Sequence, residues 1–395
     1  MKRTIIMNLC LLAAALVFAA LSFAQGKEIS GDNGFYFVQM SDTHWGFNDP
    51  AINPDYAGTL KKAINEVNAM DPAPDFVVFT GDLIQGAKDP EERRKRMLEF
   101  KEIVKTLKVK ELKFLPGEHD AAMDKGAVFT EIFGKTHYTF DHKNVHFIVL
   151  DNVSNPTSSV GDQELAWLKT VLLNFSADSR IIIFTHRPLF ELNAQWDWWT
   201  SDGERVMAMF KPFKNVTVFY GHIHNENTHI TDGMTFHAAK GLMYQLPWPG
   251  TAPKKAPVAW DPQAPYRGLG FRSVHVLPNS PNYDVLEYPI TTAEGLPQAL
   301  PTVEPMVFHV TARDYAFEPQ EINVKKDVPV VIDLSSQDEL HGFYCHDLGL
   351  RSDIVPGEVR RVRFTPHKAG VYLFSCDVHV GEGDDEMTGK IIVQE

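Results

Sequence analysis

Residues that can bind metal ions or carry protons gather at six places in the chain, each directly after a short apolar run. The clusters are Ser41-Asp42-Thr43-His44, Gly81-Asp82, Gly117-Glu118-His119-Asp120, Asp151-Asn152, His186 and Gly221-His222-Ile223-His224. Carboxylate oxygens and imidazole nitrogens are common ligands of Mn, Fe and Zn ions. These residue types therefore indicate metal binding and proton transfer.

The apolar runs before the clusters predict strands buried on both faces, because they are short, continuous and rich in Val, Ile and Phe. They span residues 35–40, 76–80, 113–115, 146–150, 180–185 and 216–220. Apolar stripes at helical spacing predict helices at 59–70, 90–107 and 163–175. This alternation predicts a layered α/β domain at 33–290, with central β-sheets flanked by helices. Because chemistry in open α/β sheets collects beyond the carboxyl ends of the strands, we expect the clusters to meet there.

Five of the clusters, taken in order, resemble the sequence blocks of the calcineurin-like metallophosphoesterase family. The blocks are Asp42-x-His44, Gly81-Asp82, Gly117-Glu118-His119-Asp120, His186 and Gly221-His222-x-His224. The resemblance covers about residues 35–289 and implies a metal-dependent phosphoric-ester hydrolase with two metal ions, divalent or of the Fe, Mn or Zn type. Two such ions deprotonate a bridging water and offset the charge on the phosphoryl oxygens.

The resemblance also implies a role for each residue of the site. The implied metal ligands are Asp42, His44 and His224 for the first ion, Glu118, His186 and His222 for the second, and Asp82 as the bridge between them. His119 is expected to donate a proton to the leaving oxygen or to steady the phosphoryl group, with Asp120 orienting its ring.

One position departs from the family pattern, which has asparagine where this chain has Glu118. The change raises the number of negatively charged ligands from two to three. A more negative site attracts a highly charged phosphate less strongly, and suits a trivalent metal or a phosphodiester better. We therefore expect a small-molecule or phosphodiester substrate.

After residue 290 the pattern of the sequence changes. Residues 291–304 are rich in Pro and Ala, which predicts a linker, and residues 305–395 contain short strand-like runs without a helical pattern. This last part predicts a small all-β sandwich, and it resembles the cupredoxin family, within it the copper domain of cytochrome oxidase subunit II. The residues that carry this likeness are His341-Gly342-Phe343, Leu348-Gly349, Pro356-Gly357, Phe364-Thr365, Gly370-Val371, Cys376 and Met387-Thr388-Gly389.

Two imidazoles, one thiolate and a weak axial sulfur are the ligands of a mononuclear copper site. The resemblance implies one copper ion bound by His341, Cys376 and His379, with Met387 or a carboxylate of the acidic segment 382–386 in the axial position. A dinuclear copper centre needs two cysteines in the last loop, which has only Cys376. The alternative is a Cys345–Cys376 disulfide, which would consume the thiolate and leave a metal-free sandwich.

The start of the chain and its composition bear on location and partners. Lys2 and Arg3 precede an apolar run from about Leu9 to Leu21, and Ser22-Phe23-Ala24 follows, which predicts a signal peptide at 1–24 and a periplasmic or secreted protein. An uncleaved membrane anchor is the alternative, although the run is short for a spanning helix. No later stretch is apolar enough to cross a membrane. The net charge of −13 argues against a nucleic-acid-binding surface.

Together these patterns predict an exported two-metal phosphodiesterase or phosphatase with a tethered mononuclear copper domain, which would also need a redox partner. The alternative is a non-catalytic phosphate-sensing or electron-transfer copper protein that uses the phosphoesterase fold as a scaffold. Hydrolysis of a phosphodiester separates the two.

Overall fold

The computed structural model describes residues 34–155, 157–249, 251–278, 283–290, 305–348, 350–378 and 387–395. The expected signal peptide, the expected linker and His379 lie outside these residues. Within the described part of the chain, no helix is both long enough and apolar enough to span a bilayer.

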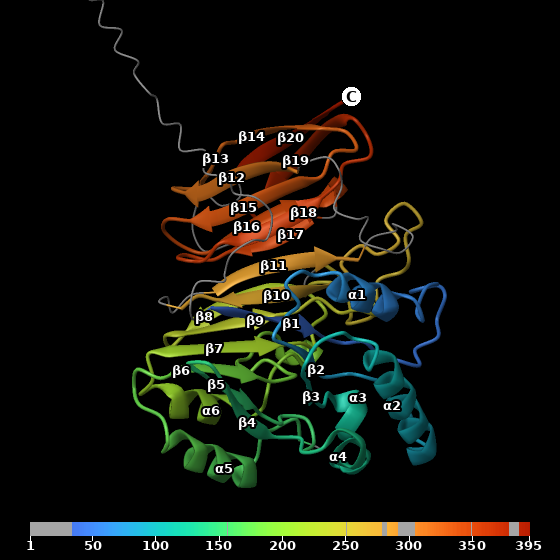
Figure 1. The fold of residues 1–395 in the computed structure, drawn as a ribbon, viewed down its shortest axis with the longest axis vertical. Helices are drawn as coiled ribbons and strands as arrows, with labels where there is room; N and C mark the ends of the chain where they lie inside the picture. The colour runs from blue at the N-terminus through green and yellow to red at the C-terminus, as the bar shows by residue number, and fades with distance from the viewer. Residues whose placement is uncertain are drawn as a thin grey trace, which may run out of the picture.

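Two β-sheets packed face to face form the centre of the N-terminal half (Figure 1). The first sheet contains β11 (Tyr283–Pro289), β10 (Gly270–Val276), β1 (Phe35–Met40), β2 (Phe76–Thr80) and β3 (Leu112–Leu115), in that order. The second contains β4 (Tyr138–His142), β5 (Val145–Val149), β6 (Arg180–Phe184), β7 (Asn215–Tyr220), β9 (Met234–Ala238) and β8 (Asn227–Thr231). Their inner faces share a core of aromatic and branched side chains, in which the Phe37 ring meets those of Phe147 and Phe184 edge-on at 6.0 and 5.6 Å.

Helices cover the outer face of each sheet, so the N-terminal half has four layers. On the first sheet lie α1 (Thr59–Asn68), α2 (Pro90–Val104) and α4 (Ala127–Phe133), and on the second lie α5 (Asp162–Leu172) and α6 (Gly203–Phe210). The start of α2 follows from its sequence, because the Asp89 side chain accepts the Glu91 N–H at 3.1 Å and Pro90 needs no hydrogen bond at the first turn.

The predicted fold class is confirmed, with differences at the element ends. The six predicted strands correspond to β1, β2, β3, β5, β6 and β7, and the three predicted helices to α1, α2 and α5, each of which ends two or three residues earlier than predicted. The sequence did not predict β4 or the β8–β9 hairpin, which have weaker apolar patterns.

The C-terminal part is the predicted β-sandwich. One sheet of it contains β14 (Glu321–Lys325), β20 (Thr388–Gln394), β19 (Gly370–Ser375), β16 (His341–Cys345) and β17 (Leu350–Ile354). The other layer contains β13 (Ala316–Glu318), β12 (Met306–Arg313), β15 (Val330–Ser336) and β18 (Arg360–Phe364). Side chains from both layers, including Ile332, Phe343 and Phe374, form one buried core.

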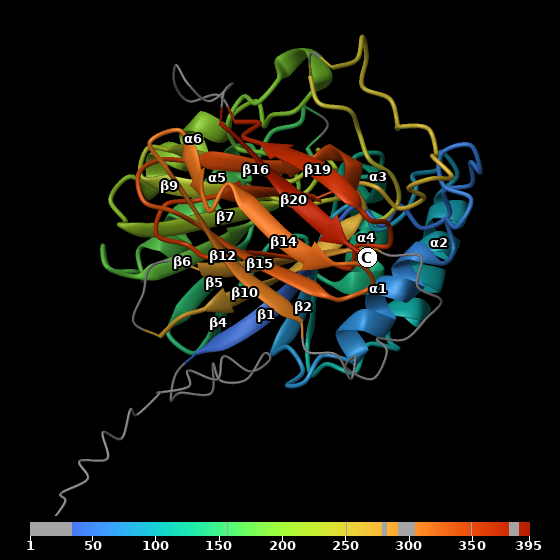
Figure 2. The same ribbon diagram turned by 90° about the horizontal axis from the view of Figure 1, so that it is seen from above.

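A single nine-stranded sheet joins the two halves, in the order β13-β12-β15-β18-β11-β10-β1-β2-β3. The junction is a parallel pairing of β11 with β18, in which Val285 faces Arg360 and Leu286 faces Arg361. Figure 2 shows the C-terminal strands lying over the N-terminal sheets. The two halves are therefore held together by backbone hydrogen bonds as well as by the chain that connects them.

Candidate metal centres

The polar clusters at the strand ends converge into one buried site. Four groups of side chains each place their ligand atoms within 4.8 Å of one another. The groups are Asp42–His44–His224, His44–Asp82–His119, Glu118–His186–His222 and Asp42–Asp82–His186. All seven side chains that the sequence proposed as ligands belong to at least one group.

One half of the site is formed by the loops after β1 and β7. His44 Nε2 lies 3.1 Å from His224 Nε2, and His224 Nε2 lies 3.3 Å from Asp42 Oδ1. All three residues are buried. Two imidazole nitrogens and a carboxylate oxygen therefore face a common point.

The other half is formed by Glu118 and by the loops after β6 and β7. Glu118 Oε2 lies 2.9 Å from His186 Nε2, and Glu118 Oε1 lies 2.7 Å from His222 Nδ1. Glu118 is the first residue of the short helix α3 (Glu118–Ala121), which places its side chain over this half of the site.

Asp82 lies between the halves. Its Oδ2 atom is 3.5 Å from His44 Nε2 and 3.5 Å from His186 Nε2, while its Oδ1 atom accepts the His119 backbone N–H at 2.9 Å. One carboxylate oxygen is thus equally close to a histidine of each half, as a bridging ligand would be.

The ligand set fits a pair of cations. Three carboxylates and four imidazoles share a small buried volume, where an uncompensated charge is costly. Burial alone would lower the pKa of His186, but the carboxylates of Asp82 and Glu118 raise it well above its usual value. The site is therefore rich in negative charge, which two metal ions would balance.

Hydrogen bonds to backbone carbonyls orient two of the rings. His186 Nδ1 lies 2.8 Å from Thr80 O, and His224 Nδ1 lies 2.7 Å from Tyr244 O. A ring nitrogen that donates to a carbonyl carries the proton, so the Nε2 atom of each ring keeps its lone pair for a metal.

Several of these residues adopt strained backbone conformations. Five non-glycine residues at the site have φ in the left-handed region: Asp42 at 52°, His44 at 39°, Asp82 at 49°, His222 at 66° and His224 at 52°. Residues with side chains rarely adopt such angles, and where they do the surrounding structure usually enforces a functional geometry. The strain supports an assigned role for these five residues.

A second candidate centre lies in the C-terminal sandwich. His341, Cys376 and Met387 are all buried; the Gly342 N–H donates to Cys376 Sγ at 3.2 Å, and the Cys376 N–H donates to Met387 O at 2.9 Å. Three of the four predicted copper ligands thus lie at one end of the sandwich, and the fourth, His379, is outside the described residues. No disulfide joins Cys345 to Cys376, so the alternative of a disulfide between them is wrong.

Comparison with known proteins agrees with both resemblances. Residues 35–226 match the calcineurin-like phosphoesterase family, and residues 296–393 match the cupredoxin-like domain. The chain is a calcineurin-like phosphoesterase domain joined to a cupredoxin-like domain.

Three relatives illustrate the two halves. The chain is 32% identical to cytochrome c oxidase subunit 2 of Thermus thermophilus over 22% of its length and 64% of that protein. It is 27% identical to a probable glycerophosphodiester phosphodiesterase of Arcobacter nitrofigilis over 53% of its length and 79% of that protein. It is 24% identical to a probable cyclic nucleotide phosphodiesterase of Rhodopseudomonas palustris over 57% of its length and 85% of that protein. The chain thus spans less than two thirds of the Thermus subunit.

His119 of the phosphoesterase domain lies at the edge of the cluster, where its ring meets that of His44 edge-on at 4.8 Å. Its Nδ1 atom accepts the Gly86 N–H at 3.0 Å. Because Nδ1 is an acceptor, the neutral ring carries its proton on Nε2.

Asp120 has a different role from the one expected. The sequence predicted that Asp120 orients the His119 ring, but its buried carboxylate accepts three backbone N–H groups instead, from Leu83 at 3.0 Å, Ile84 at 3.1 Å and Gly117 at 2.8 Å. Asp120 therefore fixes the loop after Asp82 against the loop that carries Glu118.

Sequence patterns missed several residues that support the site. The Tyr244 hydroxyl lies 3.2 Å from His44 Nε2, and its ring stacks on that of His224 at 4.4 Å. Arg187 Nη1 lies 3.7 Å from Glu118 Oε1, and Arg187 Nη2 lies 2.5 Å from Asp197 Oδ1. Of these residues, only Arg187 could have been predicted from the sequence, because it directly follows the proposed ligand His186.

Two other sequence features are structural. Asn152 is buried, and its side chain accepts the His186 N–H at 3.2 Å and donates to Arg187 O at 2.9 Å, so it orders the backbone at the end of β6. Residues 195–199 contain three tryptophans, and two of these, Trp196 and Trp198, pack into the core beside α6.

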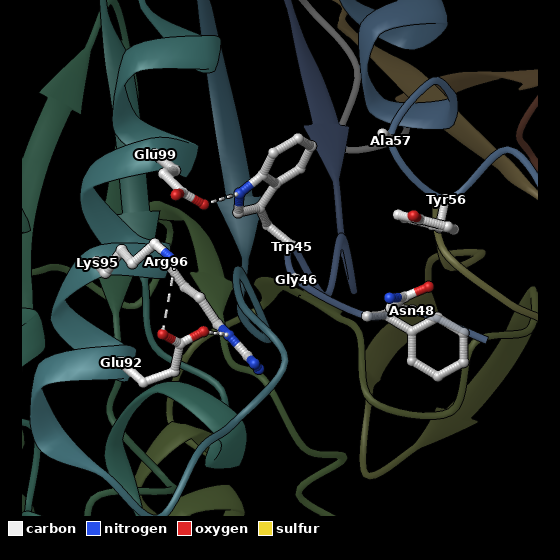
Figure 3. A pocket seen from close by; sticks show the side chains of 10 residues that line it. Trp45, Gly46, Asn48, Tyr56, Ala57, Glu92, Lys95, Arg96 and Glu99 are labelled. Carbon is white, nitrogen blue, oxygen red and sulfur yellow. Dashed lines mark hydrogen bonds and ion pairs between the residues drawn. The ribbon is translucent and has the colours of Figure 1, made fainter.

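A cavity of about 250 Å³ lies between the loop after β1 and helix α2 (Figure 3), and none of the proposed metal ligands lines it. Trp45, which directly follows His44, forms part of its wall and donates through Nε1 to Glu99 at 3.0 Å. Arg96 and Glu92 form another part and pair at 2.8 Å. The cavity thus combines aromatic surface with charged groups.

Proposed function

We propose that this protein is a two-metal phosphoric-ester hydrolase whose substrates are phosphodiesters. The observation that carries the proposal is the position of Asp82, whose Oδ2 atom lies 3.5 Å from a histidine of each half of the site. A shared carboxylate between two sets of imidazoles is the arrangement that a pair of catalytic metals requires.

We assign the metal ligands as one set for each ion. Asp42, His44 and His224 would hold the first ion, Glu118, His186 and His222 would hold the second, and Asp82 would be shared by both. An activated water and positive charge near the phosphoryl oxygens are the chemistry that such ions would supply. His119 carries a proton on Nε2 because Gly86 donates to Nδ1, so it is placed to protonate the leaving oxygen.

The charge of the site favours diesters over monoesters. Glu118 adds a negative ligand, and a phosphodiester carries one negative charge where a monoester dianion carries two. The relatives whose names describe phosphodiesterases are consistent with this choice.

Hydrolysis of bis(4-nitrophenyl) phosphate by the Mn²⁺-loaded protein tests the activity. Asp82→Asn should nearly abolish turnover, because it removes the bridging charge. His119→Ala should lower kcat by about 10²–10⁴-fold with little change in metal content, as expected for loss of a general acid. Equal rates in the wild type and both variants would show that hydrolysis does not occur at this site.

We propose further that the cupredoxin-like domain binds one copper ion through His341, Cys376 and His379, with Met387 in the axial position. The buried thiol, imidazole and thioether, which lie together at one end of the sandwich, support this ligand set.

Addition of Cu(II) to the reduced, metal-free protein should produce a thiolate-to-copper absorption band in the visible spectrum. The band should be absent in Cys376→Ser and retained in Cys345→Ser. A band of unchanged intensity in Cys376→Ser would exclude this copper site.

We propose that the mature protein works in the periplasm or outside the cell. The proposal rests on the charged, apolar and small-residue pattern of residues 1–24. Protein recovered from that compartment should begin at Gln25, and a chain that retains residues 1–24 would contradict cleavage.

A further inference from the structure

Charged side chains at the contact between the two domains, some of them buried, connect the loops that carry the two candidate centres. Glu226 lies two residues after His224, and its side chain is 5% exposed. Its Oε1 atom accepts the Asp353 backbone N–H of the cupredoxin-like domain at 2.9 Å. The segment that carries a proposed ligand of the first ion is thus fixed by the other domain.

Arg351 occupies the centre of this contact. Its Nη1 atom donates to Glu226 O at 3.4 Å and lies 4.0 Å from Glu226 Oε1. Its Nε atom donates to Asp377 Oδ2 at 3.0 Å, and its Nη1 atom lies 2.5 Å from Asp353 Oδ1. One guanidinium therefore joins the loop after β7 to the loop after β19.

Asp377 is the residue directly after Cys376, and its position is tightly constrained. A side chain on Gly342 would overlap Asp377 Oδ1, and the Gly342 N–H donates to Cys376 Sγ at 3.2 Å. A movement of Asp377 would therefore disturb both the thiol and the strand that begins at His341.

Lys240 strengthens the same contact from the phosphoesterase side. Its Nζ atom lies 3.1 Å from Glu226 Oε2 and 3.5 Å from Arg351 O. Glu226 is thus held by one cation from each domain. Removing one member of a buried ion pair is far more disruptive than removing an exposed one, because the remaining charge stays buried.

From this geometry we propose that Arg351 is a positioning residue for the dinuclear site: from the cupredoxin-like domain it holds the segment of His224 and ties that segment to the loop of Cys376. The inference rests on the metal sites of the proposed function. It assigns the C-terminal domain a part in building the phosphoesterase site. Groups that orient metal ligands from outside the ligand set typically change metal affinity by 10- to 100-fold when they are mutated.

Mn²⁺ binding to the full-length protein tests this role without reference to hydrolysis. Bound Mn²⁺ is separated from free Mn²⁺ by the electron paramagnetic resonance signal of the free ion. Arg351→Met and Glu226→Gln should each weaken Mn²⁺ binding by about tenfold or more, and Arg351→Lys should restore part of the affinity because it keeps the charge.

Arg361→Met is the matched control. Arg361 pairs with Asp333 near the same sheet junction, and among the residues that the structure describes it contacts neither Glu226 nor Asp377. The Arg361→Met variant should bind Mn²⁺ with the same affinity as the wild type. An equal loss in Arg361→Met and Arg351→Met, or an Arg351→Met affinity within twofold of the wild type, would overturn the inference.

Hydrogen exchange measures the connection between the loops directly. Mn²⁺ should slow amide exchange at residues 350–354 and 376–378 in the wild type, and this effect should be lost in Arg351→Met. The same slowing in both proteins, or none in the wild type, would contradict a connection through Arg351.

Mn²⁺ binding without phosphodiester hydrolysis would overturn the proposed activity alone, whereas no Mn²⁺ binding would overturn the metal assignment and this inference together.

Discussion

Glu118 adds a third carboxylate to a cluster that already contains Asp42 and Asp82. Its oxygens lie 2.9 Å from His186 Nε2 and 2.7 Å from His222 Nδ1. The Arg187 guanidinium, 3.7 Å from Glu118 Oε1, partly compensates the negative charge of Glu118. A neutral asparagine at this position would have no charge to compensate. The departure from the family pattern is thus accommodated by a buried cation beside it.

Removal of this charge should weaken the second metal site. Glu118→Asn should lower Mn²⁺ affinity by about tenfold or more, because it replaces an anionic ligand with a neutral one. Elemental analysis after dialysis should find fewer than two ions per chain.

Phosphodiester hydrolysis should persist in Glu118→Asn at saturating Mn²⁺, since the amide oxygen still reaches the metal. Glu131→Gln, which changes an exposed carboxylate paired with Arg94, serves as the control and should keep the wild-type metal content. Full retention of both ions in Glu118→Asn would mean that Glu118 is not a ligand.

Single residues of the site differ in how far the sequence predicts them. The proposed ligands are recognisable because each follows a buried strand in a family block. Tyr244 is not, because it lies in a loop without periodicity and reaches His44 only through the folded chain. The prediction that Asp120 orients the His119 ring was wrong. Its hydrogen-bond partners are backbone N–H groups, and these cannot be recognised from residue types in the sequence.

At the level of elements, the short loops that follow the strands determine where the proposed ligands lie. The loop after β2 and the segment before α3 are joined by the Asp120 carboxylate, which accepts three N–H groups from the two of them. A carboxylate is suited to this task because both of its oxygens are acceptors.

Asp120→Asn should therefore destabilise the fold by about 1–3 kcal/mol, because the amide group turns a donor toward at least one backbone N–H and leaves it unsatisfied. Urea unfolding of the full-length protein measures the change.

Asp89→Asn is the matched control for this substitution. Asp89 accepts the Glu91 N–H at the start of α2, and asparagine caps a helix equally well. Its unfolding midpoint should stay unchanged. A similar loss in both variants would show that the Asp120 contacts have no special weight.

Elements were predictable where their apolar pattern was strong. The central strands β1, β2, β6 and β7 are buried on both faces and were recognised from continuous apolar runs. The strands β4 and β8 lie at sheet edges and mix polar with apolar residues, so their sequences resemble loops.

The junction between the domains is the main feature of the whole molecule that sequence patterns do not predict. Pairing of β11 with β18 joins residues more than seventy positions apart. The sequence of neither strand indicates which strand it pairs with. His237 lies in this junction; burial, followed by the Arg360 guanidinium that donates to its Nδ1 atom at 3.0 Å, lowers the pKa of His237 to about 4.

This shift predicts a pH dependence of stability. The unfolded chain protonates His237 below about pH 6.5, but the folded protein does so only below about pH 4, so the free energy of unfolding falls as the pH falls between these values. The contribution of His237 between pH 7 and pH 5 is about 2 kcal/mol.

Urea unfolding at pH 7 and pH 5 tests this contribution. The loss of stability on acidification should be smaller by about 2 kcal/mol in His237→Gln than in the wild type. His367→Gln, which changes an exposed histidine beside Asp327, should follow the wild type. An identical pH dependence in all three proteins would show that His237 does not report on the junction.

β11 has a neighbour on each side only because a strand from beyond residue 305 lies against it. A chain that stopped at residue 290 would leave the backbone N–H and C=O groups on one side of β11 without a neighbouring strand. The Glu226 carboxylate and the Lys240 ammonium group would also lose their contacts with Arg351 and Asp353. Such an edge tends to recruit strands from other molecules. The phosphoesterase half is therefore not self-sufficient, because its edge strand β11 is completed by a strand of the cupredoxin-like domain.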